Sequence, residues 1–383
     1  MKILQIINAT DLDYNIGCTP LFWMLSKSLA NLGVELETTS FLGDTINTTW
    51  WKSLKNPNKS LSSFAYKSNL LLSKVSKSNS QGMQSSLVGK LLSKFAQSKW
   101  RKYLRKLLNE NQYDLIFGMN LPSKFFSDIF EDIKVEYNLP VLLYDGDAPV
   151  SLPSYGGFET GISTEYFGDL HIYDHIFTNS GGSFDEYKKF GAKSLSTLHW
   201  AVDEQLYQPR GLEKTIDNFY YAHGTEYREE WLEHIYSSVS LKNCNSVIGG
   251  GLNIDNSEGI TILPKMTIPE MIKKMDQSKI NFNIARDSHR LKGDTSSARP
   301  FELASMSSAI ISNPYKGLEK WFEPEKEIII ASDYQEFIEI YEVLLDDQSR
   351  RRELGIRARK RVQNDHTYEN RANQLISKLN EFI

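Results

Sequence analysis

The chain has 383 residues, of which 40% are hydrophobic and 24% charged, with a formal net charge of −4. This length exceeds what one hydrophobic core usually serves, so two domains are expected. Two distant cysteines, Cys18 and Cys244, exclude a disulfide framework. No run approaches the roughly 18–20 apolar residues that a membrane span needs, and residues 1–7 are too short for a signal peptide. We therefore expect a cytoplasmic protein.

The charges are unevenly distributed along the chain. Between Thr45 and Asn109 there is no Asp or Glu. That window, here called the basic window, holds thirteen positive side chains: Lys52, Lys55, Lys59, Lys67, Lys74, Lys77, Lys90, Lys94, Lys99, Arg101, Lys102, Arg105 and Lys106. Such asymmetry favours an anionic partner, which could be lipid headgroups, nucleic acid or a polyanionic glycan. A solvated surface balanced by acidic neighbours in space explains it equally well.

The chain opens with a pattern typical of a doubly wound sheet. Residues 2–8 are largely apolar, as expected of a buried parallel strand. A loop over residues 9–19 precedes a helix over residues 21–30 that Pro20 opens, and residues 34–42 predict the next strand. Gly17 lies in the loop and is a candidate ligand contact at the strand's carboxyl end. The loop is not a GxGxxG, so the sequence does not predict a dinucleotide site.

The basic window ends in a predicted amphipathic helix. Residues 60–82 are close to low complexity, whereas residues 87–108 place apolar side chains on one helical face and lysine and arginine on the other. Trp100 fits a core position, or a membrane interface into which Phe95 and Trp100 insert.

Two carboxylates follow a predicted strand in the first half. Residues 113–119 and 141–144 read as strands, and the second runs into Asp145-Gly146-Asp147 before Pro149. An Asp-x-Asp can hold a divalent cation, but Gly and Pro here equally suit a plain turn. We favour a functional position over a metal site and take Asp147 as a candidate catalytic residue.

A second α/β series follows a polar connection. Residues 196–209 end a strand and become an extended segment, and Arg210–Lys214 read as a linker. Apolar runs at 219–222, 246–248, 262–266, 279–285, 309–311 and 328–330 predict strands, with helices between them. The charged run 349–382 predicts a long helix interrupted near residues 365–367. We expect domains over residues 1–200 and 201–360, followed by a helical segment over 361–383.

The stretch from Asp294 to Glu302 is the best candidate site. It follows the strand at 279–285 and a polar loop over 286–293, so it lies at a strand's carboxyl end. Ser296 and Ser297 are N-cap candidates, and Pro300 suits the first turn of the helix that follows. A helix start attracts phosphate, and Arg299 adds a fork of charged donors. One turn in, Glu302 can accept hydrogen bonds from hydroxyl groups such as those of a ribose.

The second half contains a set of motifs that belong together: the linker His199–Pro209, Gly-x-x-x-Arg at Gly224–Arg228, Ser278–Asn283, Ser-x-Arg-x-Phe-Glu at Ser297–Glu302, and His366–Arg371. With these motifs the chain resembles the CgeB-like (spore-maturation protein-like) branch of the GT-B glycosyltransferases. The resemblance covers roughly residues 178–383. It implies an α/β fold of two doubly wound, Rossmann-like domains facing a cleft, with a C-terminal helix that crosses back to the first domain.

The same resemblance implies the reaction and its residues. The first domain, with its basic insertion at 45–109, would hold the acceptor, and the second would hold a nucleotide sugar such as a UDP-sugar. Arg228 and Arg299, with the N–H groups near Ser296 and Ser297 and the turn at Gly224, would bind the donor diphosphate. Asp294 and Glu302, separated by seven residues, would face the donor sugar and the ribose, although Asp stands at 294 where Glu is commoner. No cofactor or metal ion is implied.

Function is predicted accordingly, with its alternatives open. We expect a hexosyl- or pentosyltransferase whose acceptor is a glycan, a lipid-linked group, a protein or a modified DNA base. The alternative is a non-catalytic nucleotide- or glycan-binding module on the same fold. His223, at the end of a strand, is a third candidate catalytic residue beside Asp147 and Asp294, although no histidine has a sequence neighbour that marks it as a base. Peripheral association with a membrane through the basic window is left open.

Overall fold

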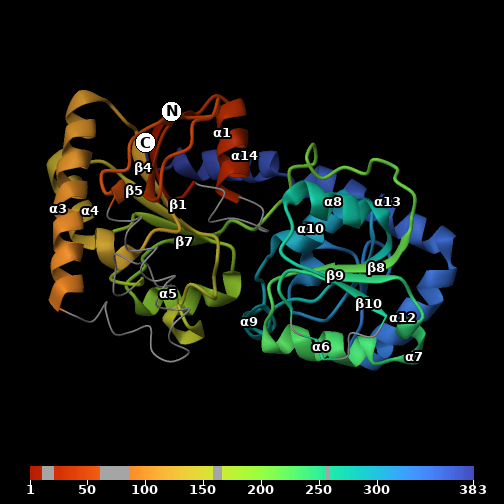
Figure 1. Ribbon diagram of the computed structural model, residues 1–383. Coiled ribbons are helices and arrows are strands. Elements are labelled where there is room, and N and C mark those ends of the chain that lie inside the picture. Colours follow the sequence, from red (N-terminus) through yellow and green to blue (C-terminus); the bar gives the residue numbers. More distant parts are fainter. Residues whose placement is uncertain (11–20, 61–86, 158–165, 253, 256–258) are drawn as a thin grey trace. The chain divides into compact units, whose positions relative to one another are not determined.

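The chain forms two α/β units (Figure 1). The computed structural model describes residues 1–10, 21–60, 87–157, 166–252, 254–255 and 259–383, and side chains from residue 91 onward in the helix that begins at 87. Within this part, unit 1 comprises residues 1–10, 21–198 and 372–383, and unit 2 comprises residues 199–371. The division falls between Leu198 and His199. It therefore comes before the polar segment Arg210–Lys214, where Arg210 N already donates to Asp276 of unit 2 at 2.8 Å.

Unit 1 is built on a seven-stranded sheet in which all pairs are parallel. Its strands are β1 (Lys2–Ala9), β2 (Glu35–Leu42), β3 (Lys52–Ser53), β4 (Leu115–Met119), β5 (Val141–Asp145), β6 (His175–Thr178) and β7 (Leu195–Thr197). The order is β3-β2-β1-β4-β5-β6-β7. Chain order reverses between β1 and β4, so the doubly wound prediction is confirmed.

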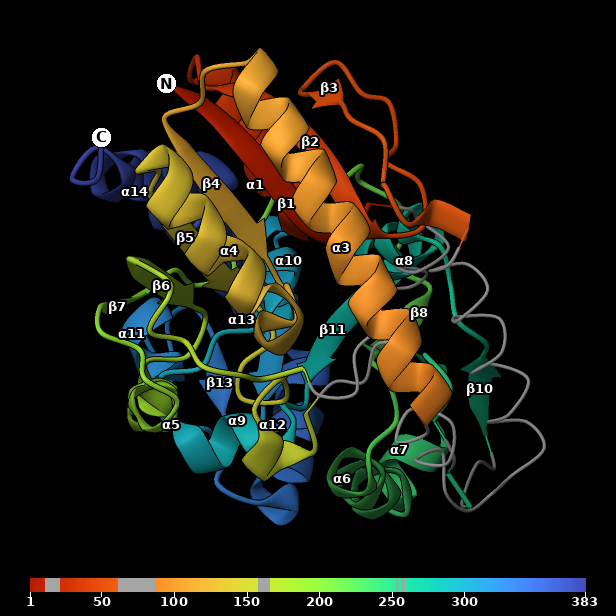
Figure 2. The same ribbon diagram turned by 90° about the vertical axis from the view of Figure 1, so that its left-hand side faces the viewer.

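Helices cover this sheet and bury its apolar faces. They are α1 (Leu21–Asn31), α3 (Leu87–Glu110), α4 (Ser123–Tyr137) and α5 (Phe184–Lys189), with short 3-10 turns η3 (Pro153–Tyr155) and η4 (Gly181–Ser183). Helix α4 packs beside α3 (Figure 2) and was not predicted from the sequence. Its apolar side chains Phe125, Phe126, Ile129, Phe130 and Ile133 are all buried.

Unit 2 repeats the doubly wound plan with six parallel strands. They are β8 (Ile216–Tyr221), β9 (Ser246–Gly249), β10 (Ile260–Leu263), β11 (Ser278–Asn283), β12 (Ala309–Ser312) and β13 (Ile329–Ile330), in the order β10-β9-β8-β11-β12-β13. The order reverses between β8 and β11. The helices are α6 (Glu226–Tyr236), α7 (Val239–Lys242), α8 (Ile268–Gln277), α9 (Asp287–Lys292), α10 (Ala298–Ser305), α11 (Leu318–Trp321), α12 (Tyr334–Asp346) and α13 (Gln348–Asp365).

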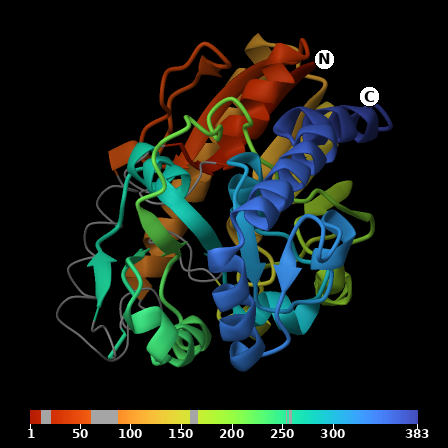
Figure 3. The same ribbon diagram turned by 90° about the vertical axis from the view of Figure 1, so that its right-hand side faces the viewer.

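The last helix returns the chain to unit 1, as predicted (Figure 3). Helix α14 (Tyr368–Leu379) begins in unit 2, and from Ala372 onward it belongs to unit 1, later than the predicted start at residue 361. Ala372, Leu375 and Leu379 are buried, and the Phe382 ring lies 5.7 Å from that of His175 on β6. The segment is therefore a packed part of unit 1.

Trp100 on α3 is a core residue. Its side chain is fully buried, with ring centroids 5.3 Å from Phe126 and 6.3 Å from Phe41. The alternative in which Trp100 inserts into a membrane is therefore wrong. Phe95, one turn earlier, is 56% exposed. None of the helices in the described ranges combines the length and apolar character that a membrane span requires.

His366, in the turn between α13 and α14, predicts acid sensitivity. Arg371 donates to its Nδ1 at 2.9 Å, so Nδ1 is the unprotonated nitrogen and Nε2 faces the Trp321 carbonyl at 3.2 Å. Burial and the Arg371 charge lower its pKa from 6.5 to about 4. Between these values the unfolded chain binds the proton and the folded chain does not. The contribution of His366 to the free energy of unfolding is therefore complete above pH 6.5. It falls by roughly 3 kcal/mol as the pH drops toward 4.

We expect the His366→Gln variant to have a flatter stability profile over this range, because its side chain does not titrate. Denaturant unfolding at a series of pH values measures this. The same replacement at the exposed His234 is the control. A His366→Gln profile as steep as that of the parent protein would contradict the assignment.

Candidate functional site

The candidate site of unit 2 lies where the order of its strands reverses. In an open parallel sheet, ligands bind beyond the carboxyl ends of the two strands on either side of such a reversal. These strands are β8 and β11, which are paired in the sheet. The segment after β8 holds His223, Gly224 and, on α6, Arg228. The segment after β11 leads through α9 to Asp294 and α10, so the topology brings most of the predicted residues to one edge.

Arg228 is built into this edge. It is 9% exposed, and its Nε donates to the Ile284 carbonyl at 2.9 Å while Nη1 donates to the His223 carbonyl at 3.1 Å. These bonds tie the segment after β8 to the segment after β11. Burial, together with the charges of Arg286 and Arg299, lowers the pKa of Arg228. A guanidinium held in this way favours an anion that would offset the neighbouring positive charges.

Positive side chains gather around His223. Burial lowers the pKa of this histidine, and the charges of Lys265, Arg286, Arg228 and Arg299 lower it further. A histidine with a lowered pKa is neutral at physiological pH, so it can accept or donate a hydrogen bond without adding charge. The four cations create a strongly positive local potential of the kind that attracts a phosphate group. Arg286 and Lys265 were not among the predicted residues, although Arg286 immediately follows the strand-like run.

The predicted polar loop before Asp294 is in fact helical. Residues 287–292 form α9, with Arg286 at its N-cap position, and His289 on it is buried. The prediction of a loop was wrong because the segment is too short and too polar to show a helical period. Burial lowers the pKa of His289 to about 3, with Arg286 and Arg228 adding to the shift.

Asp294 occupies an unusual backbone conformation. Its φ is +44°, in the left-handed region, and its N–H donates to the Lys316 carbonyl at 2.8 Å. Gly317 has a φ of +112°, and a Cβ there would lie 2.8 Å from the Asp294 nitrogen. Only glycine therefore allows the two segments to approach this closely. Such a conformation costs free energy, and it persists at functional sites because the surrounding structure enforces it.

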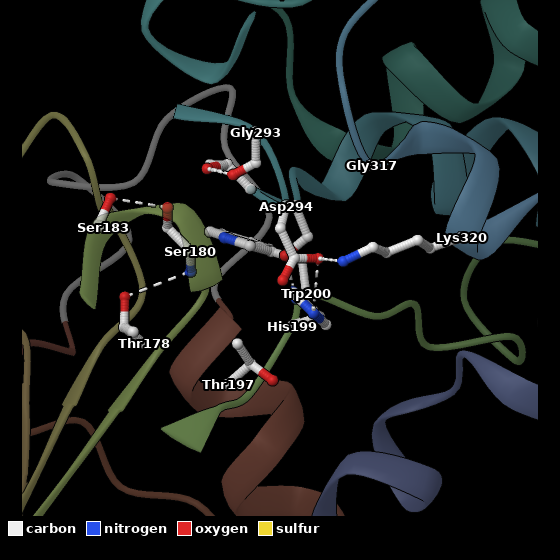
Figure 4. Close-up of polar contacts among 12 residues, drawn as sticks. Thr178, Ser180, Ser183, Thr197, His199, Trp200, Gly293, Asp294, Gly317 and Lys320 are labelled. Atoms are coloured by element: carbon white, nitrogen blue, oxygen red, sulfur yellow. Dashed lines mark hydrogen bonds and ion pairs between the residues drawn. The ribbon is translucent and has the colours of Figure 1, made fainter. Parts of the chain in front are cut away.

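The carboxylate of Asp294 faces two basic side chains, as Figure 4 shows. Its Oδ1 lies 3.1 Å from Lys320 Nζ on α11 and 3.7 Å from His199 Nε2. The His199 ring in turn packs edge-on against Trp321 at 5.1 Å. Neither Lys320 nor His199 was predicted as a partner of Asp294, because both are distant in sequence.

Helix α10 begins at the predicted position, but the predicted side-chain capping bond is not made. Ser297 occupies the N-cap without a side-chain capping bond, and Ser296 is not a cap. The hydroxyl of Ser296 is buried and accepts a hydrogen bond from Trp200 N at 2.8 Å, which fixes the segment that enters unit 2. The free N–H groups of the first turn remain a feature of the helix start.

Arg299 and Glu302 form one pair on α10. Arg299 Nη1 lies 2.8 Å from Glu302 Oε2, and its guanidinium lies 5.4 Å from the ring centroid of Tyr221 at the end of β8. Glu302 is buried. The pair thus lies between the end of β8 and the start of α10.

Gly224 lies at the turn between β8 and α6. A Cβ at this position would lie 2.9 Å from the Gly251 carbonyl and 2.7 Å from a Glu229 carboxylate oxygen. Glycine is thus required for close approach of the segments after β8 and β9. Gly17, the remaining predicted contact, lies outside the described residues.

In unit 1, Asp145 and Asp147 have different surroundings. Asp145 is buried and accepts hydrogen bonds from Ser151 Oγ at 2.6 Å and Tyr187 Oη at 2.7 Å, and burial raises its pKa. Asp147 is half-buried and accepts from the Asn120 side-chain amide. The pair is therefore not arranged as two open cation ligands. Within the described ranges, no three His, Cys, Asp or Glu side chains gather as metal ligands would.

Comparison with known proteins gives one family match. Residues 226–377 match the family model described as glycosyl transferase-like. No curated protein matches the chain at significant similarity.

Solved structures of similar fold cover the whole chain. Sucrose-phosphate synthase (tll1590) from Thermosynechococcus elongatus has a TM-score of 0.67 at 12% identity, covering 100% of this chain and 99% of that one. Anabaena Alr3699/HepE in complex with UDP and glucose has a TM-score of 0.62 at 9% identity, covering 99% of each chain. An alpha-glucosyltransferase in complex with UDP-glucose and DNA containing an abasic site has a TM-score of 0.63 at 12% identity, also covering 99% of each.

The two parallel-sheet units have the GT-B fold of these solved structures, so the predicted fold is confirmed. The match of residues 226–377 to a glycosyl transferase-like model agrees with the predicted enzyme class. Assignment to the CgeB-like branch stays a prediction, as do the roles of the individual site residues.

Proposed function

We propose that unit 2 binds a UDP-sugar as donor and that the chain transfers the sugar to an acceptor held by unit 1. The observation that carries this proposal is the group of cations around His223, at the strand reversal of unit 2. A nucleoside diphosphate carries its charge in a compact group that Arg228, Arg286 and Arg299 suit, beside the start of α10. The Anabaena structure in complex with UDP and glucose supports uridine as the nucleoside.

The arginines have a role in transfer as well as in binding. When the bond between the sugar and the diphosphate breaks, negative charge develops on the leaving diphosphate. Fixed cations stabilise that charge in the transition state. They supply the positive charge that a metal ion provides elsewhere, so we propose a transfer that requires no metal ion or other cofactor.

The carboxylates take the remaining roles in this proposal. Asp294 contacts the hydroxyl groups of the donor sugar, because its carboxylate is half-buried and oriented by Lys320. Glu302 accepts hydrogen bonds from the ribose. Asp147 is the acidic side chain that unit 1 contributes toward the acceptor, with Asn120 fixing its orientation. His223, neutral and next to the cations, donates to a phosphate or sugar oxygen.

Ligand-dependent stabilisation tests the donor. Thermal unfolding is measured with UDP, UDP-glucose, other nucleotide sugars and the matching nucleosides. A ligand at about 100-fold its Kd stabilises the folded state by roughly 2.7 kcal/mol, so a true donor raises the Tm clearly. Equal stabilisation by uridine and UDP would contradict a diphosphate site. Release of UDP from the donor separates the enzyme from a non-catalytic binding module, which would bind without turnover.

Replacing Glu302 with glutamine is expected to weaken UDP binding by about 1.5–3 kcal/mol, the scale of a hydrogen bond to a charged group. The replacement is isosteric, so the protein should remain folded. Calorimetric titration measures the change, and 2′,3′-dideoxyuridine diphosphate, which lacks both ribose hydroxyls, is the matched ligand. If the variant weakens both ligands equally, Glu302 acts through Arg299 rather than on the ribose.

A polyanionic acceptor is the second part of this proposal. A DNA-modifying beta-glucosyltransferase and an alpha-glucosyltransferase in complex with DNA have a similar fold, and the basic window provides lysines in unit 1. A DNA acceptor and a lipid-linked acceptor would use these lysines differently.

A further inference from the structure

Helix α3 has one face that packs against unit 1. Trp100, Leu104 and Leu107 on this face are buried. At its edge, Arg101 Nε lies 2.6 Å from Asp132 Oδ2 on α4, and Arg105 pairs with Glu136 on the same helix. Carboxylates of α4 thus offset the charges of Arg101 and Arg105. For these two arginines, a surface balanced by acidic neighbours accounts for the positive charge in the sequence.

The opposite face, here called the outer stripe, consists of Leu91, Phe95, Lys99 and Lys102. Their spacing of four, four and three residues places them along one line of the helix. Leu91 is 67% exposed and Phe95 is 56% exposed. Lys99 Nζ lies 4.7 Å from the centroid of the Phe95 ring. The stripe thus begins with apolar side chains and continues with lysines, on the helix that faces the viewer in Figure 2.

Two neighbours widen the stripe. Leu92 is 40% exposed, and Lys94 is exposed beside Phe95. Among the residues that the structure describes, no acidic side chain forms an ion pair with Lys94, Lys99 or Lys102. Arg101 and Arg105, in contrast, pair with carboxylates of α4. Three large apolar side chains and three lysines without acidic partners therefore share one surface.

We propose that the outer stripe, with Leu92 and Lys94, docks unit 1 onto an anionic lipid surface. Lysine ammonium groups remain at the headgroup level, while Leu91, Leu92 and Phe95 enter the boundary with the acyl chains. Duplex DNA fits less well, because the apolar side chains neutralise no phosphate and would be dehydrated without an apolar partner. The inference concerns unit 1 alone and does not depend on the proposed donor.

Co-sedimentation with lipid vesicles tests this proposal on the full chain. One set of vesicles is phosphatidylcholine, and the other is phosphatidylcholine and phosphatidylglycerol in equal parts. We expect binding to the anionic set that weakens but persists at physiological salt, because the apolar contacts are not screened. Binding to neither set at low salt would overturn the proposal.

Two variants separate charge from insertion. The variant Lys94→Gln/Lys99→Gln/Lys102→Gln is expected to bind anionic vesicles roughly a hundredfold more weakly, at about fivefold per lysine. The variant Leu91→Ser/Phe95→Ser is expected to lose the binding that survives physiological salt. Exposed residues elsewhere give matched controls: Lys242→Gln/Lys273→Gln/Lys360→Gln in unit 2 and Val135→Ser on α4. Equal loss in the controls and the stripe variants would overturn the assignment to the stripe.

Two further measurements distinguish the remaining explanations. A gel shift with duplex DNA that depends on the three lysines, without vesicle binding, would replace the lipid proposal by a DNA one. Thermal stabilisation by UDP should be the same in the stripe variants and the parent protein. That comparison shows that the variants are folded, and it keeps failure of lipid binding distinct from failure of the donor proposal.

Discussion

UDP affinity is expected to fall by about 2–5 kcal/mol when Arg228 is replaced with alanine, the range for removing one partner of a buried charge-assisted contact. The guanidinium is buried at the edge of unit 2 between the Ile284 and His223 carbonyls, next to Arg286 and Arg299. Without it, two carbonyls lose their donor and the bound diphosphate loses its most buried cation. Calorimetry with UDP and with uridine measures the effect.

The nucleoside is the internal control for Arg228, since uridine lacks the charge. We expect the affinity for uridine to change much less than that for UDP. The Arg299→Ala variant should show the same preference with a smaller loss, because Arg299 is more exposed and still leaves Arg228 in place. Equal losses for uridine and UDP would mean that Arg228 supports the fold of this edge rather than the phosphate.

Replacing Trp100 with alanine is expected to destabilise the protein by about 3–5 kcal/mol, the usual cost of deleting a buried large aromatic side chain. The ring is fully buried and contacts Phe126 on α4 and Phe41 on β2. Its loss leaves a cavity at the centre of the contact that attaches α3 to unit 1. Denaturant unfolding measures the change in free energy.

Phe95 gives the matched comparison on the same helix. Because this side chain is more than half exposed, Phe95→Ala should change the stability by no more than about 0.5 kcal/mol. Trp100→Phe should cost less than Trp100→Ala, since most of the ring volume is retained. If Trp100→Ala were as mild as Phe95→Ala, the packing of α3 would be wrong, and the outer stripe with it.

The fold of both units followed from periodicity and from the turns between elements. Apolar runs such as residues 2–8 and 309–311 could be read as buried strands because parallel strands are covered on both faces. The helix over residues 123–137 was missed, although its phenylalanines and isoleucines follow a helical period. Helix α9 was not predicted, because its six residues, of which only Leu291 is apolar, show no helical period.

The candidate site was predictable only where its residues share one segment. Arg299 and Glu302 lie one turn apart, so a helix brings them together, and the structure pairs them at 2.8 Å. Lys320 and His199 reach Asp294 from other segments, and a single sequence carries no signal for such contacts. The strained backbone of Asp294 likewise lies against Gly317, more than twenty residues later in the chain, where only glycine fits.

The two aspartates of unit 1 show the limit of reading motifs. Asp145 and Asp147 form an Asp-x-Asp motif, which by sequence alone could bind a divalent cation. Asp145 is the last residue of β5 and Asp147 lies beyond the strand, so one carboxylate is enclosed by Ser151 and Tyr187 while the other faces Asn120. Burial of one member, which the sequence could not reveal, decides against shared coordination.

The return of α14 to unit 1 has a consequence for how the protein is made. Residues 199–371 of unit 2 form one continuous stretch, whereas unit 1 needs Ala372, Leu375 and Leu379 from the end of the chain. During synthesis unit 1 therefore begins to emerge first, and its packed segment 372–383 emerges only after unit 2. While unit 2 emerges, the surface that α14 will cover stays open, and holding such a surface is a task for a chaperone. A chain that stopped before Ala372 would therefore lack a packed part of unit 1 while containing all of residues 199–371 of unit 2.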